Sequence, residues 1–109
     1  MSLEFAIQAA EKGLAWLKES GPIHGLDVDR VDIKTLNLRS TCNCVLGQLG
    51  GSYSLTMSRL IFNGAVGEDL VERILWSSAH GFDQGTRGEF NYSELDEAWR
   101  LVLEADRAQ

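Results

Sequence analysis

This sequence has little cysteine, no long apolar run and no basic leader, and each absence excludes a class of protein. Its two thiols, Cys42 and Cys44, are too close for the disulfide framework of a secreted domain, because a bridge between them would close a strained ring. No run approaches the roughly 18 apolar residues of a membrane span. The N-terminus lacks the basic segment and apolar core of a secretory signal. We therefore expect a cytoplasmic protein with no membrane partner.

Basic residues are also scarce. The 109 residues include ten Lys and Arg against sixteen Asp and Glu, for a net charge of −6. An acidic domain repels phosphate backbones, so we expect no direct nucleic-acid binding. Residues 33–67 contain no acid at all, whereas residues 68–109 contain ten. The acid-free segment is either the centre of the fold or a working surface, and charge depletion favours burial.

With 44% hydrophobic and 24% charged residues, the overall composition is typical of one globular domain over residues 1–109. Ser2 is predicted to cap a helix that ends near Ser20, where Gly21-Pro22 stops it. Its apolar arc spans about 200°, twice the stripe that a surface helix needs. Because this arc includes Phe5 and Trp16, we interpret it as a central helix or as a self-association face of a homodimer.

Two further long amphipathic helices are predicted. One spans Gly67 to His80, and the other follows a loop over residues 81–91 and is capped by Ser93. The face of the first that we expect to be buried contains Val66, Leu70, Val71, Ile74, Leu75 and Ser78. The fold class is therefore a mainly α, small single-domain helical fold, with three long helices around an irregular centre.

The irregular centre contains shorter elements. Between Ile23 and Arg39 the apolar residues alternate with other residues in pairs, but the alternation changes phase from one pair to the next. This pattern is typical of turns with one or two short strands. Ser40, Thr41 or Asn43 is expected to cap a short helix that Gly50-Gly51 ends. Residues 53–62 fit either a strand or a helix, and the stop signal at Asn63-Gly64 favours the helix.

Short motifs carry one resemblance. The run from Cys44 to Gly50, the run from Ala79 to Asp83, and Tyr92, Leu95 and Trp99 together resemble a group of small uncharacterised proteins of actinobacteria and their phages. The resemblance covers residues 26–100 and implies no activity, cofactor or catalytic residue. It implies a small accessory protein, phage-encoded, that binds and redirects a host protein.

The thiols suggest one alternative chemistry. Cys42 and Cys44 with His24 and His80 could supply four zinc ligands. The Cys-x-Cys spacing departs from the usual pairs, and the second half-site is missing. Burial of Cys44 in the core is favoured, and no cofactor is expected.

The helix predicted to end at His80 carries the favoured binding site. Asp69, Arg73, Trp76 and His80 share one ridge, opposite the face of Leu70 and Ile74. Because Trp and Arg are enriched at binding hot spots, we interpret this ridge as a contact patch for a host or cellular protein. The competing interpretation is that residues 81–91 fold over Trp76 and bury it.

The sequence contains no Gly-x-Ser-x-Gly nucleophile elbow, no His-Glu-x-x-His zinc-binding helix and no Walker phosphate-binding loop. We therefore expect no enzyme. The favoured function is a non-enzymatic, protein-binding accessory or regulatory protein. The alternatives are a Cys/His zinc protein and an acidic nucleic-acid mimic that inhibits a DNA-binding protein. The mimic rests on the ten acids of residues 68–109.

Overall fold

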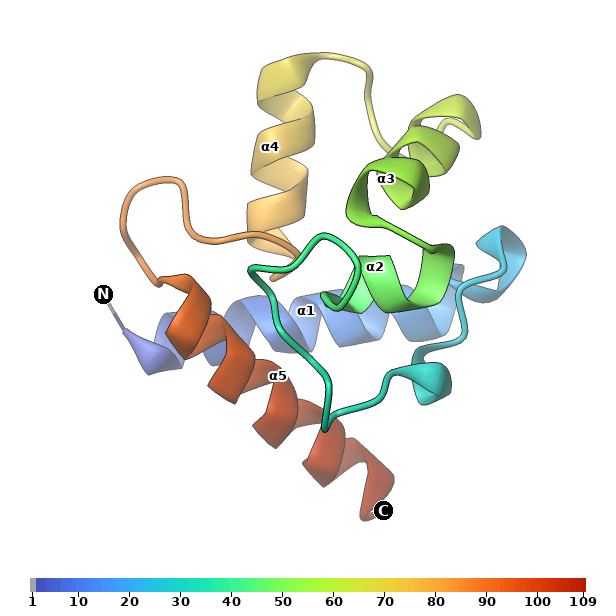
Figure 1. Cartoon of the computed structure of the whole chain (residues 1–109). Coiled ribbons are helices and arrows are strands. Elements are labelled where there is room, and N and C mark those ends of the chain that lie inside the picture. Colours follow the sequence, from blue (N-terminus) through green and yellow to red (C-terminus); the bar gives the residue numbers. More distant parts are fainter. Residues whose placement is uncertain (1) are drawn as a thin grey trace.

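The computed structural model describes residues 2–109 and is mainly helical, as predicted (Figure 1). Helices α1 and α5 have 18 and 16 residues, and the other three have ten or fewer, so the prediction of three long helices is not supported. Within residues 2–109 no helix has both the length and the apolar character needed to cross a bilayer. The elements are α1 (Leu3–Ser20), α2 (Val45–Gly50), α3 (Tyr53–Phe62), α4 (Leu70–Ala79) and α5 (Tyr92–Arg107), with 3₁₀ turns at Pro22–His24 and Val28–Arg30.

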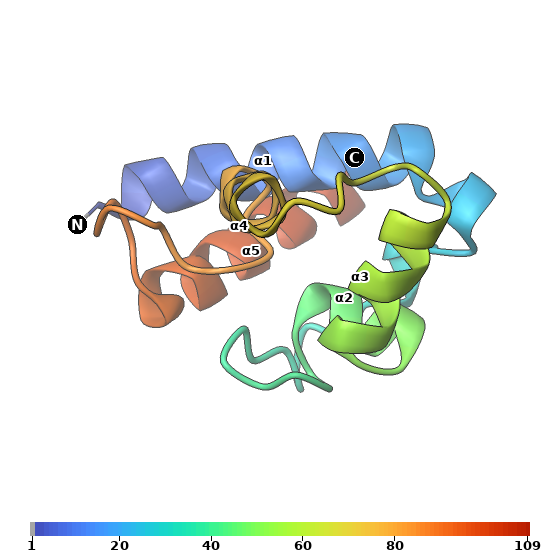
Figure 2. The same ribbon diagram turned by 90° about the horizontal axis from the view of Figure 1, so that it is seen from above.

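Helices α1 and α5 pack obliquely against one another (Figure 1), and Figure 2 shows them on one side of the molecule with α2 and α3 on the other. Ser2 caps α1 as predicted, because its Oγ accepts a hydrogen bond from the Phe5 amide at 3.3 Å. The cap of α5 is Asn91 and not Ser93. Asn91 Oδ1 accepts from the Glu94 amide at 2.9 Å, while Glu94 Oε1 accepts from the Asn91 amide at 3.0 Å. This reciprocal pair satisfies two amides that a helix start otherwise leaves open.

The turn after α4 is wedged between α1 and α5. Trp99 of α5 is completely buried, and its Nε1 donates to the Gly81 carbonyl at 2.6 Å. Gly81 has φ +68°, and a Cβ there would lie 2.9 Å from the backbone nitrogen of Ala10. Gly13 is just as restricted, because a Cβ would collide with the His80 carbonyl and the Trp99 ring. Small residues on α1 therefore let two other segments approach its backbone closely.

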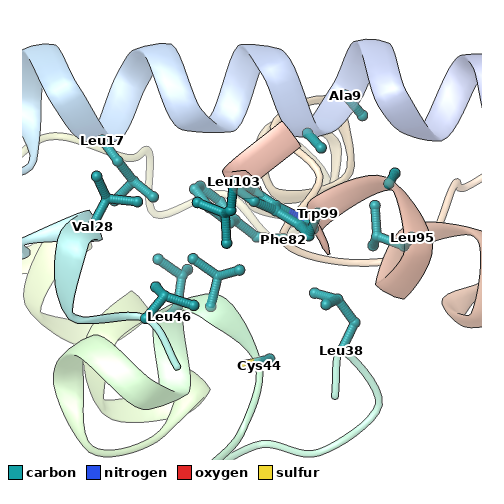
Figure 3. Packing of buried hydrophobic residues seen from close by; sticks show 14 of the residues in the cluster. Ala9, Leu17, Val28, Leu38, Cys44, Leu46, Phe82, Leu95, Trp99 and Leu103 are labelled. Atoms are coloured by element: carbon teal, nitrogen blue, oxygen red, sulfur yellow. The ribbon is translucent and has the colours of Figure 1, made fainter. Parts of the chain in front are cut away.

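Trp99 and Phe82 occupy the middle of the core, between α1 and the segment that leads into α2 (Figure 3). Their rings are stacked with centroids 5.9 Å apart. Leu38, Cys44 and Leu46, all from the acid-free segment, are buried against this centre. The acid-free segment is thus buried only in part, since Leu55 and Phe62 of the same segment are 64% and 91% exposed.

The segment between α1 and α2 contains no strand in the described chain, so the prediction of short strands is wrong there. Side chains satisfy its backbone groups in place of a strand ladder. Arg107 Nη2 donates to the Val31 carbonyl at 2.7 Å, and Asp96 Oδ1 accepts from the Leu38 amide at 2.6 Å. Helix α5 thus fixes this irregular segment with its own side chains.

The helix favoured over residues 53–62 is present as α3, which begins after Ser52 and ends before Asn63. Helix α2 is also present, but its cap is Cys44 and not Ser40, Thr41 or Asn43. Cys44 Sγ accepts from the Gly47 amide at 3.3 Å, because Gly47 is the third residue of α2 and a cap side chain reaches that amide.

We predict that Gly13→Ala destabilises the protein, although Gly to Ala inside a helix ordinarily stabilises by up to about 1 kcal/mol. The added methyl group would overpack the crossing with His80 and Trp99. We expect a net loss of about 1–3 kcal/mol in the free energy of unfolding, measured by urea denaturation. Ala15→Gly, at an exposed position of the same helix, is the control and should cost about 1 kcal/mol. A stabilised Gly13→Ala variant would contradict this helix crossing.

Candidate functional site

Helix α4 rises away from the α1 and α5 pair, and its C-terminal end lies nearer to that pair than its N-terminal end (Figures 1 and 2). Its inner side contributes Trp76, which lies in an aromatic cluster. The Trp76 ring meets the edge of Trp16 at 5.1 Å, stacks on His80 at 4.5 Å and lies 5.5 Å from Phe82. One residue on, the buried Ser77 forms a hydrogen bond of 2.6 Å with the Tyr53 hydroxyl. These contacts determine which side of α4 faces the body.

The prediction that Leu70, Val71, Ile74 and Leu75 are buried is therefore wrong. Their side chains are 57%, 62%, 43% and 51% exposed, respectively. Aromatic stacking and the Ser77 hydrogen bond turn the opposite side of the helix inward, which leaves much of the aliphatic side exposed. We call these four residues the aliphatic face of α4.

The aliphatic face continues into a hollow beside the first turns of α1. The hollow has a volume of about 380 Å³, and Leu75 forms part of its wall. Phe5, on its rim, is 52% exposed. The apolar lining consists of Phe5, Ala9, Leu75, Ala79 and Phe90. The face and the hollow together form a continuous apolar surface, of the kind that marks interaction sites.

Acidic side chains accompany the N-terminal end of this surface. Glu68, Asp69 and Glu72 are all exposed there, and Asp69 caps α4 by accepting from the Glu72 amide at 3.0 Å. At the other end the hollow contains Lys12 and Glu89. The surface therefore has an apolar middle, acidic residues at one end and one residue of each charge at the other.

The four residues predicted as a contact patch do not share one environment. Asp69 is exposed at the cap of α4, and Arg73 is half-buried in a cleft beside α3. Trp76 and His80 are half-buried in the aromatic cluster. Sequence reasoning assigned the four residues of the aliphatic face to the core, because an apolar arc does not reveal which side of a helix the fold covers.

Phe5 and Trp16 were predicted to share a self-association face. They lie on α1 about three turns apart, and Trp16 packs against Trp76 and stacks on His24 at 6.1 Å. Phe5 alone contributes to the exposed apolar surface.

The four candidate zinc ligands are dispersed. Cys42 is exposed, whereas burial raises the pKa of the Cys44 thiol, whose sulfur caps α2. His24 and His80 both contact the Trp16 ring, far along the chain from the thiols. Nowhere in residues 2–109 do three His, Cys, Asp or Glu side chains gather as metal ligands would. The predicted alternative of a zinc site thus has no donor set in this part of the chain.

Comparison with known proteins adds no relative to this picture. No family model, no curated protein and no solved structure matches the chain. The assignment of the site therefore rests on geometry alone.

We predict that Trp76→Ala lowers the free energy of unfolding by about 2–4 kcal/mol, because it removes a half-buried ring from a packed cluster. Leu75→Ala is the matched control, since the neighbouring side chain points outward and should cost well under 1 kcal/mol. Urea denaturation measures both variants. A larger loss for Leu75→Ala than for Trp76→Ala would show that the orientation of α4 is different.

We also predict a pH dependence due to His80. Burial lowers its pKa below the usual 6.5, against the opposing effect of the hydrogen bond between Nδ1 and the Trp76 carbonyl. The unfolded chain therefore takes up a proton more readily than the folded one, and stability should decrease as pH falls below 6.5. In denaturation curves between about pH 7.5 and 5.5, His80→Phe should show a shallower slope than the wild type. Identical slopes would exclude His80 as the source.

Proposed function

We propose that this chain is a non-enzymatic accessory protein that binds another protein through the aliphatic face of α4. The observation that supports this proposal most strongly is the exposure of four large aliphatic side chains on one helix of ten residues. Val71 and Leu75 are four residues apart, as are Leu70 and Ile74, so the four side chains form two adjacent rows on one helix. Uncovered rows of this kind on a folded domain are the usual signature of an interface.

The charges around the face indicate the chemistry of the partner. Glu68, Asp69 and Glu72 lie beside the apolar rows, so a complementary surface has an apolar strip with basic residues at one end. A second copy of this chain also has a net charge of −6 and would present the same acids. We therefore propose a different protein as the partner in preference to a homodimer.

The expected context supports a host protein as the partner. The motifs resemble those of small proteins of actinobacteria and their phages, and phage accessory proteins commonly redirect host proteins. We accordingly propose a host protein with a basic, partly apolar docking surface. A partner of this kind would be recruited faster at low salt, because steering between opposite charges is screened by ions.

The test is photo-crosslinking in the producing cells, with p-benzoylphenylalanine replacing Leu75. We expect one dominant crosslinked protein, with a loss of crosslinking of about tenfold when Glu68 and Glu72 are both changed to Lys. Placement of the same group at Leu55, an exposed position of α3, is the control and should not give this product.

Two outcomes would contradict the proposal. Equal products from positions 55 and 75 would mean that the aliphatic face has no specific partner. A product consisting of two copies of this chain would show that the face is covered by self-association and does not bind a host protein.

A further inference from the structure

A second hollow lies on the other flank of α4, between this helix and α3. Its volume is about 340 Å³, which is in the range of small-molecule sites, roughly 300–1,000 Å³. Helix α3 contributes Tyr53 and Met57, and the loop after α4 contributes Asp83. We call this hollow the α3/α4 cleft.

Two opposite charges enter the α3/α4 cleft without meeting. Arg73 is half-buried, and within residues 2–109 it has neither an ion pair nor a hydrogen bond from its guanidinium. Asp83 accepts two hydrogen bonds, from the Tyr92 hydroxyl at 2.6 Å and from the Gln84 amide at 2.8 Å, and both end on Oδ1. No donor from the described chain reaches its Oδ2. No nitrogen of Arg73 lies within 4.0 Å of an Asp83 oxygen, although both residues line the same hollow.

The rest of the cleft is divided between apolar and hydroxyl groups. Met57 is buried, and Leu70 and Ile74 complete an apolar wall. Ser54 and Ser58 contribute hydroxyl groups. A ligand that fits must therefore combine a short aliphatic group with polar groups of both signs.

We infer that the α3/α4 cleft binds a free α-amino acid with an aliphatic side chain. The carboxylate of the ligand pairs with the planar guanidinium of Arg73, which can donate two parallel hydrogen bonds. The ammonium group pairs with Asp83 Oδ2, and the side chain packs against Met57, Leu70 and Ile74.

Other small ligands fit less well because the cleft contains both signs of charge. A ligand with only a negative group would be attracted by Arg73 but repelled by Asp83. A ligand with only an amine would be attracted by Asp83 but repelled by Arg73. A zwitterion satisfies both groups at once.

The first test is an NMR titration of the ¹⁵N-labelled wild-type chain with L-leucine up to about 10 mM, enough to detect millimolar binding. We expect saturable shifts of the amides of α3, α4 and residues 82–84. Two analogues serve as probes of the charges: 4-methylpentanoate lacks the ammonium group, and 3-methylbutylamine lacks the carboxylate. Each should bind at least about tenfold more weakly, because each leaves one half-buried charge of the cleft unpaired.

The second test uses variants. Arg73→Gln and Asp83→Asn should each weaken leucine binding at least about tenfold. The Asn side chain keeps an oxygen that can accept from Tyr92 and Gln84, so the loop should retain its shape. Arg87→Gln, an exposed arginine outside the cleft, is the control and should bind leucine normally.

The absence of saturable shifts in the wild type would overturn the inference, as would either analogue binding as tightly as leucine. These measurements use the chain without its protein partner. Their failure therefore leaves the crosslinking result at position 75 unaffected, and the two proposals can fail separately.

Discussion

The hydrogen bond from the Trp99 indole to the Gly81 carbonyl determines the arrangement of the other helices. It lies inside the crossing of α1, α5 and the turn that ends α4, where an unpaired indole or carbonyl would cost about 1–3 kcal/mol. The bond is geometrically feasible only because α1 presents Ala10 and Gly13 at this crossing, so that neighbouring backbone can approach without side chains between. Larger residues at these positions would push Gly81 outward and separate it from Trp99. The end of α4 is thus fixed at one point, and the direction of the whole helix follows from that point.

Fixing α4 in this way gives its two flanks different roles. The inner side supports the aromatic cluster around Trp76, while the aliphatic face is uncovered, and the α3/α4 cleft lies between the two. Leu70 and Ile74 belong to both the face and the cleft. A ligand in the cleft would therefore alter part of the surface offered to a protein partner, and by linkage the partner would alter the affinity for the ligand by the same factor.

Local signals in the sequence predicted the mainly α class, the Ser2 cap and the helix ending before Asn63, because neighbouring residues alone determine a cap or a stop. The start of α5 was placed too late, since Ser93 and Asn91 are both good caps. Glu94, three residues after Asn91, was the signal for the reciprocal pair.

The orientation of α4 was not predictable in the same way, because its outward side is more hydrophobic than its inward side. The choice depends on Trp16, Tyr53 and Phe82, which come from other parts of the chain. The cleft likewise joins α3, α4 and the following loop, which no sequence spacing reveals.

The packing of α1 against α5 also has a consequence for how the chain folds as it is made. In the sequence, residues 21–91 separate these two helices. Helix α1 therefore leaves the ribosome well before α5, which packs against it. Until then Gly13 has no Trp99 ring to pack against, and closing so long a loop carries an entropic cost. Translation proceeds at about 5–20 residues per second, so this interval lasts several seconds. A helical protein whose most extensive helix pair, α1 with α5, is this distant in sequence cannot complete its core one segment at a time.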